Sequence, residues 1–183
     1  MGAFIIIVLI IGGLFWFFKY KNQQNNKKEE EGLETILLEI TSDLIATISK
    51  YKSIVMPKIL SKAQLNHNPD KKQVMIEMGN SGEINDIVMP IIQEVLKSDI
   101  DRLSYKIFSL GMVNSKFRIE DTETDVFKIN SITIRSTLHF GIGNEFRRMN
   151  ILQYDESQLQ RFIIRNANFV TDQLNKSYDK INN

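Results

Sequence analysis

The sequence of 183 residues contains no cysteine. That absence excludes disulfide bonds, thiolate zinc sites and cysteine nucleophiles, and it leaves the redox environment of the protein undetermined. Histidine is nearly as scarce, since only His67 and His139 occur. Two isolated histidines without cysteine cannot assemble a usual zinc ligand set, so we interpret both as structural residues.

Sequence motifs for catalysis or phosphate binding are also missing. The chain has no G-x-x-x-x-G-K-[ST] loop, no G-x-S-x-G elbow and no H-E-x-x-H pair. Residues 121–125 begin like a calcium loop, but Val126 stands where that loop needs glycine and Ile132 where it needs glutamate. The sequence therefore predicts no catalytic residue, no cofactor and no metal site. An enzyme built from carboxylates such as Glu120 and Asp121 is the least favoured class.

The charge balance gives no reason to expect a nucleic acid partner. All 22 acidic residues lie at Glu29 or later, together with 19 of the 23 Lys and Arg residues, so this part carries a net charge near −3. A domain that binds nucleic acid needs a basic surface to neutralise phosphates. We therefore expect no nucleic acid partner.

A long apolar run is the most distinctive feature that is present. Gly2–Phe18 has no charged side chain, and in hydrocarbon such a segment must be helical to satisfy its backbone groups. At about 1.5 Å per residue the run covers about 25 Å, the short end of what spans a bilayer core. The sequence thus predicts a transmembrane anchor over residues 1–19, in contact with the lipid bilayer through residues 2–18. A polar spacer over residues 20–31 follows it.

Other interpretations of the apolar run fit less well. A cleaved signal peptide needs basic residues before the core and a small-residue cleavage site after it, and both are missing. Myristoylation at Gly2 needs Ser or Thr at position 6, where Ile6 stands. Since lysines only follow the run, the positive-inside rule predicts a single-pass, signal-anchor protein of the cell membrane with a cytoplasmic C-terminal domain. These lysines are Lys19, Lys21, Lys27 and Lys28.

Helical spacing dominates the first part of the remaining chain. Apolar residues three and four apart predict a helix over 33–55, which Pro57 should end or kink. A short helix over 58–65 and a helix that starts at Asn68 are expected next. Residues 84–100 predict a further helix, kinked or started by Pro90. The pattern over 102–111 fits either helix or strand.

The later part of the chain predicts a change of structure. Residues 116–120 alternate, and Ile132, Ile134, Leu138 and Phe140 keep a two-residue step, which favours strands. We therefore expect a small antiparallel meander over 116–154. A closing helix is expected after it, capped by Asp155 or Ser157.

These expectations combine into an α+β fold class: a single N-terminal transmembrane helix, then a mostly helical domain with a small antiparallel sheet over residues 32–183. No motif identifies a family. The sequence favours a membrane-anchored, non-enzymatic interaction or scaffold protein with a protein partner of unknown identity. The alternative is an envelope-facing ligand-binding or accessory domain of opposite topology.

Overall fold

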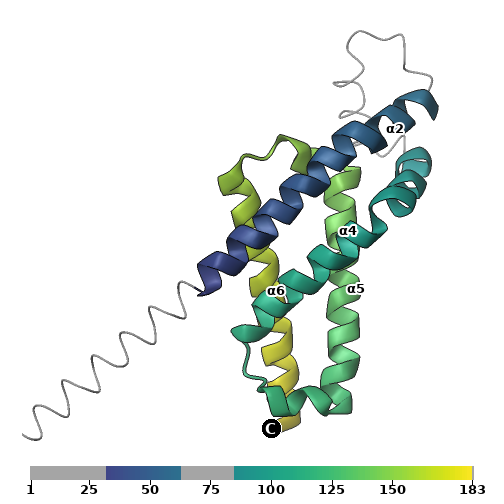
Figure 1. Cartoon of the computed structure of the whole chain (residues 1–183). Helices are drawn as coiled ribbons and strands as arrows, with labels where there is room; N and C mark the ends of the chain where they lie inside the picture. Colours follow the sequence, from purple (N-terminus) through teal and green to yellow (C-terminus); the bar gives the residue numbers. More distant parts are fainter. Residues whose placement is uncertain (1–31, 63–84, 183) are drawn as a thin grey trace, which may run out of the picture. The chain divides into compact units, whose positions relative to one another are not determined.

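The computed structural model describes residues 32–62 and 85–182, which are about 92% helical and contain no strand (Figure 1). The chain divides after Leu38 into two compact units. The first is described only over residues 32–38, which are helical, and the second contains the packed core. In chain order the elements are a helix over 32–50, the π-helix η1 (Tyr51–Val55), α2 (Met56–Lys62), α4 (Asn85–Val113), the 3-10 helix η2 (Ile119–Glu123), α5 (Asp125–Arg147), the 3-10 helix η3 (Asn150–Gln153) and α6 (Glu156–Asn182).

Ion pairs show that the helical segment 39–62 runs antiparallel to α4. Near one end Lys106 donates to Asp43 at 2.7 Å, and near the other Lys58 donates to Glu94 at 2.6 Å. Hydrogen bonds to Asp43 and Glu39 raise the pKa of Lys106, because both carboxylates stabilise its charged form. The residues that pair therefore lie in opposite order along the two helices.

The core lies where four helical segments meet. α4 packs against both α5 and α6, α5 packs against α6, and η1 and α2 pack against α4 (Figure 1). Burial of apolar surface at these contacts is the main force that holds the helices together. The largest fully buried side chains are Tyr51, Phe146, Ile40, Leu44, Ile59, Ile91, Ile92, Leu96, Ile100, Leu103 and Ile107.

A glycine allows α4 and α6 to approach closely. A Cβ atom on Gly111 would lie 2.4 Å from the carbonyl oxygen of Ala167 and 2.6 Å from Cβ of Val170. The hydroxyl of Thr171 donates to the Gly111 carbonyl at 2.7 Å and so bridges the two helices. The absence of a side chain at position 111 is thus required by the packing of α6.

The predicted sheet over residues 116–154 is wrong, and so is the α+β class. Most of this stretch forms α5. Its buried side chains are four or seven residues apart, which is the spacing of an amphipathic helix. The apparent two-residue step arose because two exposed residues, Ile132 and Phe140, each stand two positions from a buried one. The buried side chains are Phe127, Ile134, Leu138, Ile142 and Phe146.

The structure also corrects the predicted single-pass membrane localisation. No helix within residues 32–62 and 85–182 is long and apolar enough to cross a membrane. Charge is the physical reason, since even α4, the longest of them, carries Lys97, Asp101 and Arg102 in its middle. The predicted span Gly2–Phe18 and the spacer after it lie outside the described residues.

Several of the predicted helices agree with the structure. The helices expected over 33–55 and after residue 155 are confirmed. The helix expected over 84–100 is confirmed from Asn85, where the described residues resume, and residues 102–111 continue α4. Pro57 does not end its helix. The residues before it form the wider π-helix η1, because in a regular α-helix the proline ring would clash with the carbonyl group four residues earlier. Asp155 caps α6, since its Oδ1 accepts from the backbone N–H of Gln158 at 2.7 Å. The helix start predicted at Asn68 lies outside the described residues.

Tyr51 offers a test of the core. Its side chain is fully buried and stacks on Phe146 at 5.7 Å, and its hydroxyl has no hydrogen-bond partner among the described residues. Burial raises the pKa of Tyr51 far above its ordinary value. An unpaired buried hydroxyl is destabilising, so we expect Tyr51→Phe to raise the free energy of unfolding by about 1 kcal/mol in a urea titration. A loss of stability instead would show that a bound water satisfies the hydroxyl.

Candidate interaction surface

A groove of about 380 Å³ lies between α4 and α5. Like the segment 39–62, α5 runs antiparallel to α4, because Asp101 faces His139 while Tyr105, one turn later, faces Arg135, one turn earlier. The groove therefore follows the seam between the two helices. Its lining residues are Lys97, Asp101, Ser104, Ile132, Arg135, Ser136 and His139.

Two contacts across the seam fix the polar side chains of the groove. The Cζ atom of Arg135 lies 5.5 Å from the centre of the Tyr105 ring, a cation–π contact. Nδ1 of His139 is buried and lies 2.8 Å from Oδ1 of Asp101, but the pair does not meet hydrogen-bond geometry. The contact is an ion pair only when the imidazole is protonated.

The groove has more cationic than anionic groups. Among the described residues Asp101 is the only carboxylate that lines it, against Lys97, Arg135 and His139. Within the described chain, neither Lys97 nor Arg135 forms an ion pair. The two permanent cations are thus left to solvent or to a ligand. The hydroxyl of Ser104 is already used, because it donates to the carbonyl of Ile100 at 2.7 Å.

An exposed apolar stripe on α5 borders the groove. Ile129, Ile132 and Phe140 are 65%, 64% and 64% exposed, and Val126 precedes them on the same side of the helix. Spacings of three and eight residues keep these side chains on one face. We call these four residues the α5 stripe. Single exposed apolar residues are ordinary on protein surfaces, but several on one helix face beside a groove are typical of binding sites.

The face of α5 that carries the stripe is free of negative charge. Between Val126 and Asn144 the sequence has no Asp or Glu, although the chain beyond Glu29 is acidic overall. Arg135 is exposed along this part of α5, whereas the exposed Lys128 is paired with Glu123 at 3.1 Å. The surface thus combines apolar side chains with the positive charges of Arg135 and Lys97.

Residues singled out in the sequence are not brought together. Asp121 accepts from the backbone N–H of Arg118 at 2.8 Å, and Thr124 caps α5, so the acidic run organises a local turn. His139 lies on α5, whereas His67 is outside the described residues. No group of three His, Asp or Glu side chains in the described parts of the chain is close enough to hold a metal ion. Arg147 donates to Asn144 at 3.2 Å and does not line the groove.

Comparison with known proteins adds no function. No family model, no curated protein and no solved structure matches this chain. The groove and the α5 stripe therefore carry the functional argument by themselves. Sequence reasoning missed this surface because it assigned Ile132 and Phe140 to strands. Neither residue follows the three- and four-residue spacing of the buried residues of α5. That difference was the signal in the sequence that could have revealed the surface.

Proposed function

We propose that this chain is a non-enzymatic interaction protein, and that the groove and the α5 stripe bind an acidic amphipathic helix of a partner protein. The observation that carries the proposal is the α5 stripe: three large apolar side chains, each about two-thirds exposed, beside two unpaired cations. Proteins often retain features that break the local pattern where they serve binding.

The spacing of the surface fits a helix as the occupant. The stripe extends along one face of α5 from Val126 to Phe140, and a helix laid beside α5 would place apolar side chains at i, i+3 or i+4 and i+7 against it. Helices pack in this way by inserting rows of side chains between those of the neighbour. The same docked helix would bring its flanking residues over the groove.

The charges of the surface indicate which charge the partner helix should carry. Lys97 and Arg135 lie on the side of the α5 stripe that borders the groove. On its other side α5 carries uncharged residues such as Thr133 and Thr137. Acidic residues on one flank of the partner helix would pair with the two cations. A basic helix would meet repulsion from these cations, and the groove itself offers it the carboxylate of Asp101.

The test uses a designed helical peptide as the probe and the full-length chain as the target. The peptide has leucines at i, i+3 and i+7 spacing and glutamates along the flanks, and its binding is followed by fluorescence anisotropy. We expect saturable binding that weakens with salt. Ile129→Gln or Ile132→Gln should weaken it about tenfold each, because each removes one buried apolar anchor. Arg135→Gln should weaken binding and reduce its salt dependence.

Ile164→Gln on α6 is the matched control, because Ile164 is also an exposed isoleucine but lies away from the groove. It should leave peptide binding unchanged. A peptide with lysines in place of the glutamates should bind at least about tenfold more weakly. Equal binding of the two peptides, or equal effects of all three isoleucine substitutions, would contradict the proposal. Concentration-dependent dimerisation abolished by Ile132→Gln would instead make a second copy of the chain the occupant.

A further inference from the structure

A second cavity, of about 250 Å³, lies on α6 and carries a different chemistry from the groove. It is lined by Tyr154, Gln158, Arg161, Phe162 and Arg165. Arg161 and Arg165 are one helical turn apart, so they lie on the same face of α6. The cavity is therefore lined by two guanidinium groups and by two aromatic residues, one of which carries a phenol hydroxyl.

Neither arginine is neutralised by the protein. Among the residues that the structure describes, Arg161 makes a hydrogen bond only to the backbone carbonyl of Ser157, at 3.4 Å, and Arg165 stacks over the Phe162 ring at 5.6 Å. Neither contact involves a carboxylate. Asp155, just before α6, uses its Oδ1 to accept a hydrogen bond from the backbone N–H of Gln158. Both guanidinium groups thus keep N–H donors for a ligand.

We propose that this cavity binds the phosphoryl group of a small phosphate ester. Two guanidinium groups supply N–H donors in the fork geometry that suits phosphate oxygens, and a phosphate dianion would neutralise both charges. Stacking of Arg165 on Phe162 limits the motion of that guanidinium, which lowers the entropy lost on binding. This inference is independent of the α4–α5 surface and adds a ligand site to the proposed interaction protein.

A phosphoryl group suits the cavity better than a carboxylate. A carboxylate offers two oxygens, whereas a phosphate ester offers three that are free to accept hydrogen bonds. The two arginines and the hydroxyl of Tyr154 are three donor groups of the same cavity. The half-buried Tyr154 also offers its ring to the organic part of an ester.

The experiment titrates full-length chain with inorganic phosphate, phenyl phosphate and acetate at constant ionic strength, followed by calorimetry and by NMR of the arginine side chains. We expect saturable binding of both phosphates, with phenyl phosphate the tighter ligand because its ring can contact Tyr154. Acetate should bind at least about tenfold more weakly. Arg161→Gln and Arg165→Gln should each weaken phosphate binding about tenfold, because each removes charge-assisted hydrogen bonds.

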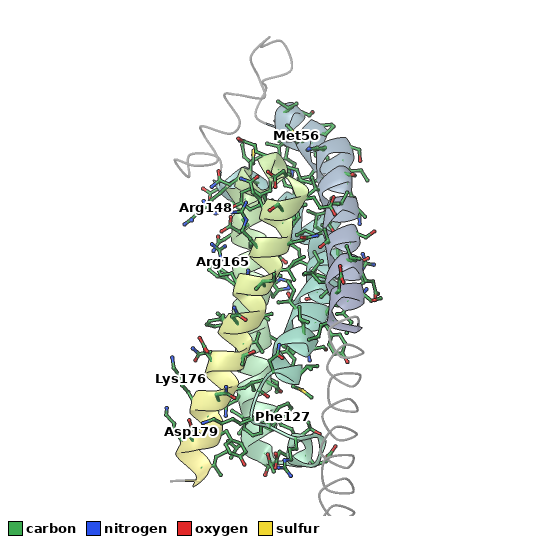
Figure 2. The ribbon with its side chains drawn as sticks, turned by 90° about the vertical axis from the view of Figure 1, so that its left-hand side faces the viewer. Met56, Phe127, Arg148, Arg165, Lys176 and Asp179 are labelled. Atoms are coloured by element: carbon green, nitrogen blue, oxygen red, sulfur yellow. The ribbon has the colours of Figure 1, made fainter. Side chains whose placement is uncertain are left out.

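The matched control is Lys176→Gln, which removes an exposed positive charge from the same helix (Figure 2). It should leave phosphate binding unchanged. Tighter binding of phenyl phosphate than of inorganic phosphate assigns the site to an organic ester, and the reverse order assigns it to free phosphate. The proposal is overturned if acetate binds as tightly as phosphate, or if Lys176→Gln weakens binding as much as Arg165→Gln does. Absence of saturable phosphate binding overturns it as well.

Discussion

Replacement of Gly111 by alanine is expected to destabilise the fold by about 3 kcal/mol, the upper end of the range for overpacked cores. The new Cβ atom would lie 2.4 Å from the carbonyl oxygen of Ala167 and 2.6 Å from Cβ of Val170. The first of these atoms belongs to the backbone of α6, so relief requires α6 to move away from α4. Such a shift would also break the hydrogen bond from Thr171 to the Gly111 carbonyl.

Gly141→Ala is the matched control, since Gly141 also lies within a helix but has no atom within 4 Å of the added Cβ. There the higher helix propensity of alanine should raise the free energy of unfolding by about 0.5–1 kcal/mol. Urea unfolding of the full-length chain, followed by circular dichroism, measures both. Opposite signs for the two substitutions support the close contact of α4 and α6. A stabilising effect at both positions would contradict it.

Replacement of Phe162 by alanine is expected to destabilise the fold by about 3–5 kcal/mol. The side chain is 4% exposed and lies on the inner face of α6, together with the fully buried Leu174. Its removal leaves a cavity that the surrounding helices can fill only in part. A loss of this size is a large share of the stability of a small domain. The same urea titration measures it.

The contrast is Phe140→Ala, the same chemical change on the exposed α5 stripe. Phe140 is largely exposed, so its replacement should change the free energy of unfolding by less than about 0.5 kcal/mol. Phe169, which is half-buried on α6, should give an intermediate loss. If Phe162→Ala left the unfolding midpoint unchanged, α6 would not close the core. In that case α6 would be free to act as a docking element.

The terminal helix shows how far sequence patterns can reach. Local patterns predicted a closing helix with Asp155 as one of two candidate caps, and the structure agrees. Such features depend on residues three and four positions apart, which the sequence displays directly. The pairing of Gly111 with Ala167 joins two residues that are 56 positions apart in the sequence, so no local pattern could show it.

α5 shows where the same reasoning failed. Its isoleucines, threonines and valine have stronger strand than helix propensity, and its exposed stripe disturbs the three- and four-residue pattern of its buried face. Tertiary packing overrides that preference, because burial of Phe127, Leu138 and Phe146 against neighbouring helices stabilises α5 by more than its propensities oppose it. The candidate surface was hidden by the same residues that misled the strand assignment.

Composition and local periodicity predicted the absence of cysteine chemistry, the acidic balance beyond Glu29, and helices over 33–55, over 84–100 (described from Asn85) and after residue 155. These features need no knowledge of contacts. Packing between the helices determines three others: residues 125–147 are helical, Lys97 and Arg135 lie beside the α5 stripe, and two arginines share a cavity on α6. Those features depend on which face of each helix is buried and which is exposed to solvent. Packing between residues far apart in the chain determines this.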